Sequence, residues 1–299
     1  MAQVPVLEFG GSHVCSALVD FSSGSPRVAH LTHHPLDPDG SREEIATPML
    51  NAALAVPKTR GLAWGISAPG PFDYRNGVAL YADKLESVGK FAALQGWDMR
   101  AALAEVLDSP ASLTFVNDAD AFGLGEFAIG AGAGYDKVIF LTLGTGLGSA
   151  FIDRGSLVTE GEGLPANGWV YQLQMDGRPI EDFVSSRALR RGYQQLTGVD
   201  SDVREIAAAA RAGEPLAARV LNEGMESLGR FLAPLCRVFE ADAIVIGGGI
   251  TKSWDLLLAP VQAGLRQADA ALGSLPVLRA ASGRQTQLVG TALAVPGTV

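Results

Sequence analysis

Three glycine-rich turns come directly after short runs of apolar residues, and each has the composition to hold a phosphate group. Glycines let main-chain N–H groups approach an anion without obstruction by a Cβ atom, and neighbouring hydroxyls add donors. A single turn of this kind is often only a hairpin, so the repetition is what favours phosphate binding. The turns follow residues 4–9, 138–143 and 243–246 and consist of Gly10, Gly11 and Ser12, of Gly144, Thr145 and Gly146, and of Gly247, Gly248 and Gly249.

Acidic and amide side chains stand at the ends of two expected strands. Glu8 precedes the first glycine turn, where a carboxylate can bind a divalent metal ion, directly or through water, beside a bound phosphate. The alternative is a solvated carboxylate in a plain hairpin. Asn117 and Asp118 follow the strand 113–116 and precede a helical segment, so they are either capping residues or part of a reaction site.

Two further segments are candidates for the wall of a pocket. Pro69 and Gly70 lie in a rigid turn after the strand 61–67, and such a turn can present backbone groups at a pocket mouth. The loop 158–178 contains Asn167 and Tyr171, and its length favours a functional loop.

The segments that must position these residues alternate between strand-like and helical patterns, which predicts an α/β fold. With 299 residues and 47% hydrophobic content, the chain can bury a large core, and its length favours two domains. We expect strands at 4–9, 13–21, 61–67, 113–116, 138–143, 150–152, 243–246 and 276–279. We expect helices at 42–54, 99–107, 119–129, 180–193, 201–212, 214–238, 254–268 and 287–294.

The overall charge and composition disfavour several classes of protein. The net charge of -9 argues against a nucleic-acid-binding surface, and we expect the arginines at 187, 190 and 191 to form a solvated helix face. Cys15 and Cys236 are the only cysteines, so neither a disulfide framework nor a Cys-rich structural zinc site is expected. No export signal or membrane span is indicated, which favours the cytoplasm.

Taken together, the motifs resemble those of the ROK family of bacterial sugar kinases and repressors, within the actin-like ATPase superfamily. The similar segments are EFGGSHVCSALVD (first phosphate loop), SAPGPFD (PGP turn), VNDADAFGLGE (catalytic segment), LTLGTGLGSAF (second phosphate loop) and IVIGGGI (adenosine loop). The resemblance spans nearly the whole chain. It implies a two-domain actin-like ATPase (ribonuclease H-like) fold with an inter-domain cleft that closes on a sugar. No DNA-binding motif precedes the first loop, which disfavours the repressor branch.

The same resemblance implies domain boundaries and roles for individual residues. A small N-terminal domain, 1–116, would be completed by the C-terminal helix 286–299, and a larger domain would cover 117–285. Asp118 matches the catalytic base, which takes the proton from the sugar hydroxyl as it attacks the γ-phosphate of ATP. Sugar ligands would be Pro69, Gly70, Asp83, Asn117, Asp118, Asn167, Tyr171 and Glu181. The phosphates and nucleotide, with their Mg²⁺, would be held by Glu8 and by Gly10, Gly11, Ser12, His13, Gly144, Thr145, Gly146, Gly247, Gly248 and Gly249.

Departures from the family pattern concern both the phosphate and the sugar side. The family usually has Asp at the position of Glu8, and Thr then Lys at those of Ser12 and His13. Its Cys-rich zinc loop and the associated histidine are missing, so no structural zinc site is expected. Asn167 and Tyr171 replace a sugar-binding Glu and that histidine. Asp83 stands near a family Asn, and an ionised acid there favours an amino group.

Three functions are therefore considered. The leading one is an ATP-dependent kinase that phosphorylates the 6-hydroxyl of a glucose-like hexose. The second is a kinase of an aminosugar such as kanosamine (3-amino-3-deoxyglucose) in natural-product biosynthesis. The third is a non-catalytic sugar-sensing protein, while polyphosphate as donor is disfavoured because the acidic chain has few basic residues. A homodimer is implied by the family alone.

Overall fold

The computed structural model describes residues 2–81, 91–281 and 283–298 of a chain that divides into two units. The first unit consists of Met1–Gly125 and Gly283–Val299, and the second of Glu126–Ser282. Each unit contains one five-stranded sheet.

The sheet of the first unit mixes antiparallel and parallel strands. Its order is β3 (Arg27–Pro35), β2 (His13–Asp20), β1 (Gln3–Phe9), β4 (Ala63–Ala68) and β7 (Ser112–Asn117). The first three pair antiparallel, whereas β4 and β7 run parallel to β1. The carboxyl ends of β1, β4 and β7 therefore meet at one edge of the sheet, which is where ligands bind in many α/β proteins.

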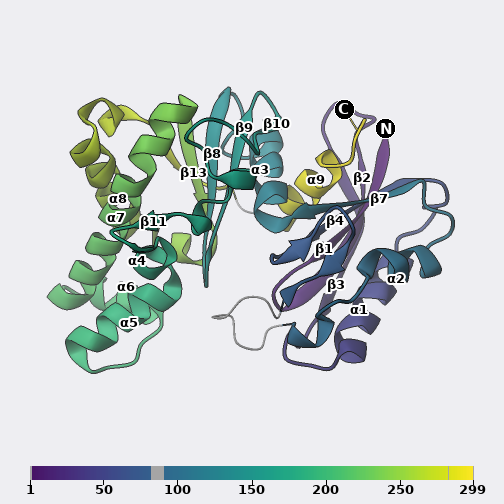
Figure 1. Cartoon of the computed structure of the whole chain (residues 1–299), viewed down its shortest axis with the longest axis horizontal. Helices are drawn as coiled ribbons and strands as arrows, with labels where there is room; N and C mark the ends of the chain where they lie inside the picture. Colours follow the sequence, from purple (N-terminus) through teal and green to yellow (C-terminus); the bar gives the residue numbers. More distant parts are fainter. Residues whose placement is uncertain (1, 82–90, 282, 299) are drawn as a thin grey trace. The chain divides into compact units, whose positions relative to one another are not determined.

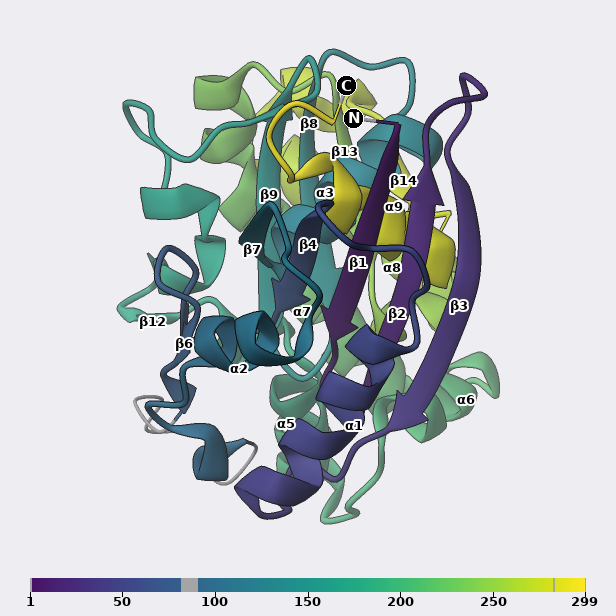
Figure 2. The ribbon, with the colours of Figure 1, turned by 90° about the vertical axis from the view of Figure 1, so that its right-hand side faces the viewer.

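The side chains of β1 point alternately to the two faces of the sheet, so the core of this unit has two layers. Leu7 and Phe9 are buried on one face with α1 (Arg42–Leu54) and α2 (Met99–Val106), whereas Val4 and Val6 are buried on the other with α9 (Arg284–Leu293). Figure 2 shows α1 and α2 in front of the sheet and α9 behind it. The unit also contains the hairpin of β5 (Phe72–Asp73) and β6 (Val78–Ala79) and the 3₁₀ turn η2 (Ala92–Leu94).

The second unit is built in the same way around its own sheet. The strand order is β10 (Ser156–Leu157), β9 (Leu147–Asp153), β8 (Lys137–Leu143), β13 (Ala243–Gly247) and β14 (Val277–Arg279). Its helices are α4 (Glu181–Val184), α5 (Ser186–Thr197), α6 (Val203–Arg211), α7 (Pro215–Phe239) and α8 (Trp254–Ala268) (Figure 1). Shorter pieces are η3 (Ala166–Gly168), η4 (Val170–Gln172), η5 (Gly249–Ser253), η6 (Ala270–Ser274) and the hairpin of β11 (Gln174–Met175) and β12 (Arg178–Pro179).

Helix α3 (Asp118–Ile129) begins in the first unit because its backbone lies against α9. A Cβ atom added to Gly290 would lie 1.7 Å from the carbonyl oxygen of Ala121, and one added to Gly125 would lie 1.9 Å from that of Thr286. The division consequently falls between Gly125 and Glu126, nine residues after the boundary expected from the sequence.

Two other features differ from the expectations drawn from the sequence. The expected helix 180–193 is two helices, because Ser185 is extended (φ -72°, ψ 160°) and caps α5. Strand β3 was not expected at all. Among the residues that the structure describes, no helix has the length and apolar character needed to span a bilayer.

Candidate functional site

The first glycine turn joins β1 to β2 and leaves its main chain accessible. The N–H of Gly10 donates to the carbonyl oxygen of His13 (2.8 Å), which closes the turn. Gly11 and Ser12 are exposed, and a Cβ at Gly11 would meet no atom within 4 Å. A Cβ at Gly10, by contrast, would lie 2.9 Å from the His13 ring. The turn therefore offers open backbone beside an imidazole.

Glu8 and His13 form an ion pair at the base of this turn. His13 Nε2 lies 3.6 Å from Glu8 Oε1. Hydrogen bonding to Cys15 and then to Glu8 raises the pKa of His13 to about 9, against the opposing effect of burial. His13 is consequently a cation at neutral pH, at the position where the family pattern has Lys. The second carboxylate oxygen of Glu8 is buried with no hydrogen-bond partner among the described residues, so it is available to a ligand.

Asn117 and Asp118 lie at the carboxyl end of β7, and both side chains cap the helix that follows. The N–H of Ala119 donates to Asn117 Oδ1 (2.9 Å) and to Asp118 Oδ1 (3.0 Å). Both side chains do more than cap the helix. Asn117 Nδ2 also donates a hydrogen bond to Tyr74 Oη (2.7 Å), and the Asp118 side chain is exposed. The Tyr74 hydroxyl donates in turn to the carbonyl oxygen of Ala68 (3.1 Å).

The PGP turn lies next to this pair. Ala68 is in register with Asn117 across β4 and β7, and Pro69 and Gly70 follow directly. A Cβ at Gly70 would lie 3.4 Å from Tyr74 Oη and 3.7 Å from Asn117 Nδ2. The structure thus brings together Gly70, Asn117 and Asp118 from the predicted set and adds Tyr74, which no pattern in the sequence singled out. Asp83 lies outside the described residues.

Asp120 is a buried acid two residues after Asp118. It is 9% exposed. Burial, and to a lesser extent the negative charge of Asp118, raises the pKa of Asp120 to about 8. A protonated Asp120 avoids placing a second negative charge next to that of Asp118.

The second and third glycine turns lie side by side in the second unit. Gly247 at the end of β13 is in register with Thr142 on β8, so both turns leave the same edge of the sheet. Gly248 has φ +92°, and a Cβ there would lie 2.2 Å from the carbonyl oxygen of Leu143. Only glycine fits that approach. Thr145 and Gly249 are exposed, so the two turns present accessible backbone together.

Glu181 contacts the second glycine turn through its carboxylate. Its Oε1 accepts a hydrogen bond from the N–H of Leu147 (2.7 Å), and a Cβ at Gly146 would lie 2.6 Å from the same oxygen. One carboxylate oxygen of Glu181 is therefore engaged with the phosphate-type turn in this structure. A contact between Glu181 and a sugar stays a prediction.

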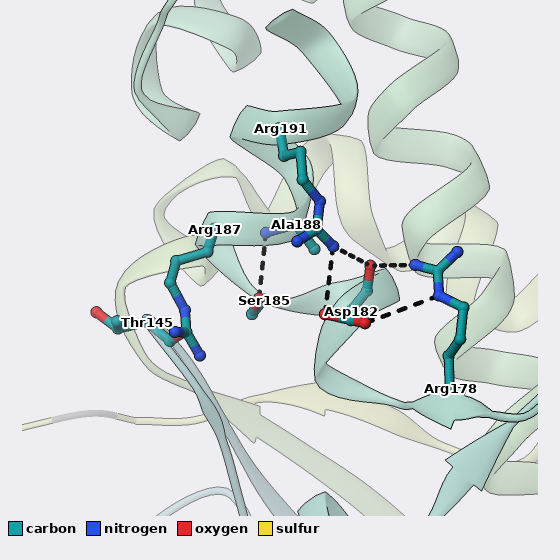
Figure 3. A network of polar contacts seen from close by, with 7 residues as sticks. All are labelled: Thr145, Arg178, Asp182, Ser185, Arg187, Ala188 and Arg191. Atoms are coloured by element: carbon teal, nitrogen blue, oxygen red, sulfur yellow. Dashed lines mark hydrogen bonds and ion pairs between the residues drawn. The ribbon is translucent and has the colours of Figure 1, made fainter. Parts of the chain in front are cut away.

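Helix α5 begins at the second turn and adds positive charge to it. The N–H of Ser186 donates to the carbonyl oxygen of Gly144 (2.8 Å). Arg187 Nε donates to the carbonyl oxygen of Thr145 (3.3 Å), and Figure 3 shows these two residues next to each other. A helix N-terminus with an adjacent guanidinium group favours an anion. Arg191 fits the expectation of a solvated helix face better than Arg187 does. Its side chain is half exposed and pairs with Asp182 (3.2 Å) (Figure 3).

The loop after β10 is anchored to the second sheet near its middle. Ser149 Oγ donates to the carbonyl oxygen of Gly168 (2.6 Å) and accepts from the N–H of Val170 (2.9 Å). Asn167 is exposed with φ +58°, and Tyr171 stacks on Trp169 with ring centroids 6.0 Å apart. Both predicted residues are thus held in an ordered segment, and their contact with a sugar stays a prediction.

Comparison with known proteins gives one family and one fold. The model of the ROK family matches residues 6–297. The glucokinase of Streptomyces coelicolor is 28% identical over 283 residues, which are 86% of this chain and 84% of that protein. The crystal structure of a ROK hexokinase from Thermus thermophilus has a TM-score of 0.77 at 26% identity and covers 98% of this chain and 97% of its own.

A second solved structure is that of a ROK family glucokinase from Streptomyces griseus in complex with glucose and AMPPNP. Its TM-score is 0.72 at 25% identity, and it covers 97% of this chain and 98% of its own. These likenesses confirm the predicted α/β fold of the actin-like ATPase type. Because the family model covers nearly the whole sequence, the chain belongs to the ROK family.

Proposed function

We propose that this protein is an ATP-dependent sugar kinase that phosphorylates the 6-hydroxyl of a glucose-like hexose, with Asp118 as the general base. The observation that carries the proposal is the arrangement at the end of β7, where an exposed Asp118 adjoins Asn117, Gly70 and Tyr74. Membership of a family with curated glucokinases supports it.

The first unit supplies groups for a hydroxyl nucleophile. Burial raises the pKa of Asp120 to about 8 and keeps this carboxyl largely protonated near neutral pH. The exposed carboxylate of Asp118 would orient a hydroxyl and accept its proton. Asn117 is held by Tyr74, which leaves its amide fixed beside the same position. In phosphoryl transfer such positioning, together with charge stabilisation, supplies most of the catalysis.

The glycine turns fit the phosphates of a nucleotide. Gly11 and Gly144 are open where a Cβ would project, and Gly248 has the positive φ that the third turn needs. Arg187 and His13 each place a positive charge at a turn. A Mg²⁺ ion carried by the nucleotide would neutralise phosphate charge, and Glu8 has a free buried oxygen for it or for one of its waters.

A non-catalytic sugar-sensing protein is the second candidate. It is favoured by the ion pair between Glu8 and His13, which engages the acid that would otherwise serve the metal ion. The aminosugar alternative rests on the altered sugar loop at Asn167 and Tyr171 and on Asp83, which lies outside the described residues. A homodimer stays a prediction from the family alone.

The three functions can be separated with purified protein in one series of assays. ADP release is measured with ATP and Mg²⁺ against glucose, mannose, N-acetylglucosamine and kanosamine, and calorimetry measures sugar and nucleotide binding separately. We expect the highest kcat/KM with glucose. Preference for kanosamine would favour the second function, and sugar binding without nucleotide affinity or ADP release would favour the third.

A further inference from the structure

A second cluster of metal-ligand side chains lies on the sheet of the first unit. His13 and Cys15 of β2 and His33 of β3 each offer one ligand atom, and these three atoms all lie within 4.8 Å of one another. Within the ranges 2–81, 91–281 and 283–298, they form the one group of this kind that includes nitrogen and sulfur donors. We propose that they bind a borderline-soft divalent ion such as Zn²⁺.

The pairing of the strands places these donors together. Cys15 is in register with His33 on β3 and with Glu8 on β1, and His13 lies two residues before Cys15 on the same face. Side chains directly opposite on neighbouring antiparallel strands have Cβ atoms roughly 5 Å apart. The strand pairing therefore brings His13, Cys15 and His33 together, with Glu8 on the neighbouring strand opposite Cys15.

The donor types suit a tetrahedral site. Imidazole nitrogen and thiolate are the preferred ligands of Zn²⁺, at about 2.0 and 2.3 Å, which implies about 3.3 to 3.6 Å between neighbouring ligand atoms. Glu8 Oε1 lies 3.6 Å from His13 Nε2, so a shift of the Glu8 side chain towards the cluster would supply the fourth ligand. Its other oxygen is buried without a hydrogen-bond partner among the described residues.

An ion can reach the cluster from one side. Cys15 is fully buried, whereas His13 is partly exposed and His33 is exposed. The rings of His13 and His33 are stacked with centroids 5.2 Å apart, so binding requires His33 to turn its ring nitrogen towards the Cys15 sulfur. An exposed side chain can make that turn without disturbing the core. Coordination also ionises the Cys15 thiol, and the protons displaced from the ligands go to solvent.

Occupancy would alter the first glycine turn. Glu8 and His13 flank Gly10, Gly11 and Ser12, so a bound ion withdraws both charged groups from that turn. This consequence rests on the proposed function: if the turn holds nucleotide phosphates, Zn²⁺ at the cluster inhibits phosphoryl transfer. Binding of the ion itself does not depend on the proposed function.

Cobalt substitution tests the site directly. Titration of the reduced full-length protein with Co²⁺ is followed by absorption, because a thiolate ligand gives a charge-transfer band that oxygen and nitrogen ligands do not give. We expect a band at one equivalent that Zn²⁺ abolishes. His33→Asn should weaken Zn²⁺ binding by at least about tenfold, and because its side chain is exposed the variant should keep its fold.

Matched variants separate this site from adventitious binding. Cys15→Ser should remove the band, whereas Cys236→Ser, at the other buried thiol, should not. His30→Asn changes an exposed histidine of the same strand, whose left-handed φ of +54° asparagine tolerates, and should leave binding unchanged. An absent band, or equal Zn²⁺ affinity in wild type and His33→Asn, would overturn the proposal. A band with unaltered ADP release would overturn only the inhibitory consequence.

Discussion

At the scale of single residues, the environment of Asp120 makes stability depend on pH. The folded pKa, raised to about 8 by burial, lies above the unfolded value, so the folded state binds the extra proton. Stability is therefore lost as pH rises between roughly 4 and 8, with a contribution of up to about 1.4 kcal/mol per pH unit. We expect Asp120→Asn to flatten this part of the profile and to be more stable than wild type at pH 8.

Urea unfolding at pH 5, 6.5 and 8 measures that effect. Asp108→Asn, at an exposed carboxylate of the same unit, is the control and should follow the wild-type profile. Parallel profiles for wild type and Asp120→Asn would show that Asp120 is ionised in the folded protein, contrary to the expectation.

Tyr74 positions Asn117 through one hydroxyl. Tyr74→Phe leaves the ring in place but removes the hydroxyl, which is the hydrogen-bond partner of both Asn117 Nδ2 and the Ala68 carbonyl oxygen. We expect a loss of about 1 kcal/mol of stability, together with a higher KM for the sugar because the amide of Asn117 is no longer fixed. The assay compares KM for sugar and for ATP in the two proteins. An increase in KM for ATP alone would contradict a role of Tyr74 in positioning Asn117 for the sugar.

At the scale of elements, the contact between α3 and α9 depends on glycine. A Cβ at Gly290 would lie 1.7 Å from the Ala121 carbonyl oxygen, so Gly290→Ala forces the two helix backbones apart. We expect a destabilisation of about 2 kcal/mol or more, measured by urea unfolding. Gly192→Ala is the matched control, since its Cβ would meet only an ordinary contact at 3.7 Å and alanine favours a helix. Equal stability of the two variants would exclude the close contact.

The sequence predicted elements well where their periodicity reflects burial. The glycine turns and the strands before them lie as expected, because apolar runs that end in glycine have few other structures. Strand β3 was missed since most of its side chains are exposed and its three histidines obscure the alternation. The break at Ser185 was missed because the helical pattern continues through it, whereas the extended backbone of Ser185 ends α4 and its side chain caps α5.

At the scale of the whole molecule, candidate site residues from each unit could be predicted only where they belong to a motif. Asn117, Asp118 and the glycines fall in such motifs. Tyr74 and Arg187 do not, and their places beside the candidate residues follow from hydrogen bonds between segments distant in sequence. Closure of the two domains on a sugar stays a prediction, and small-angle scattering with and without glucose would measure it.

In the proposed function, Asp118 acts as the general base of a sugar kinase. The most direct measurement is kcat for glucose phosphorylation by wild type, Asp118→Asn and the control Asp108→Asn, with the product identified as the 6-phosphate by NMR. We predict that Asp118→Asn lowers kcat by at least about a hundredfold while glucose still binds by calorimetry, and that Asp108→Asn is unaffected. Comparable turnover in wild type and Asp118→Asn would contradict the account.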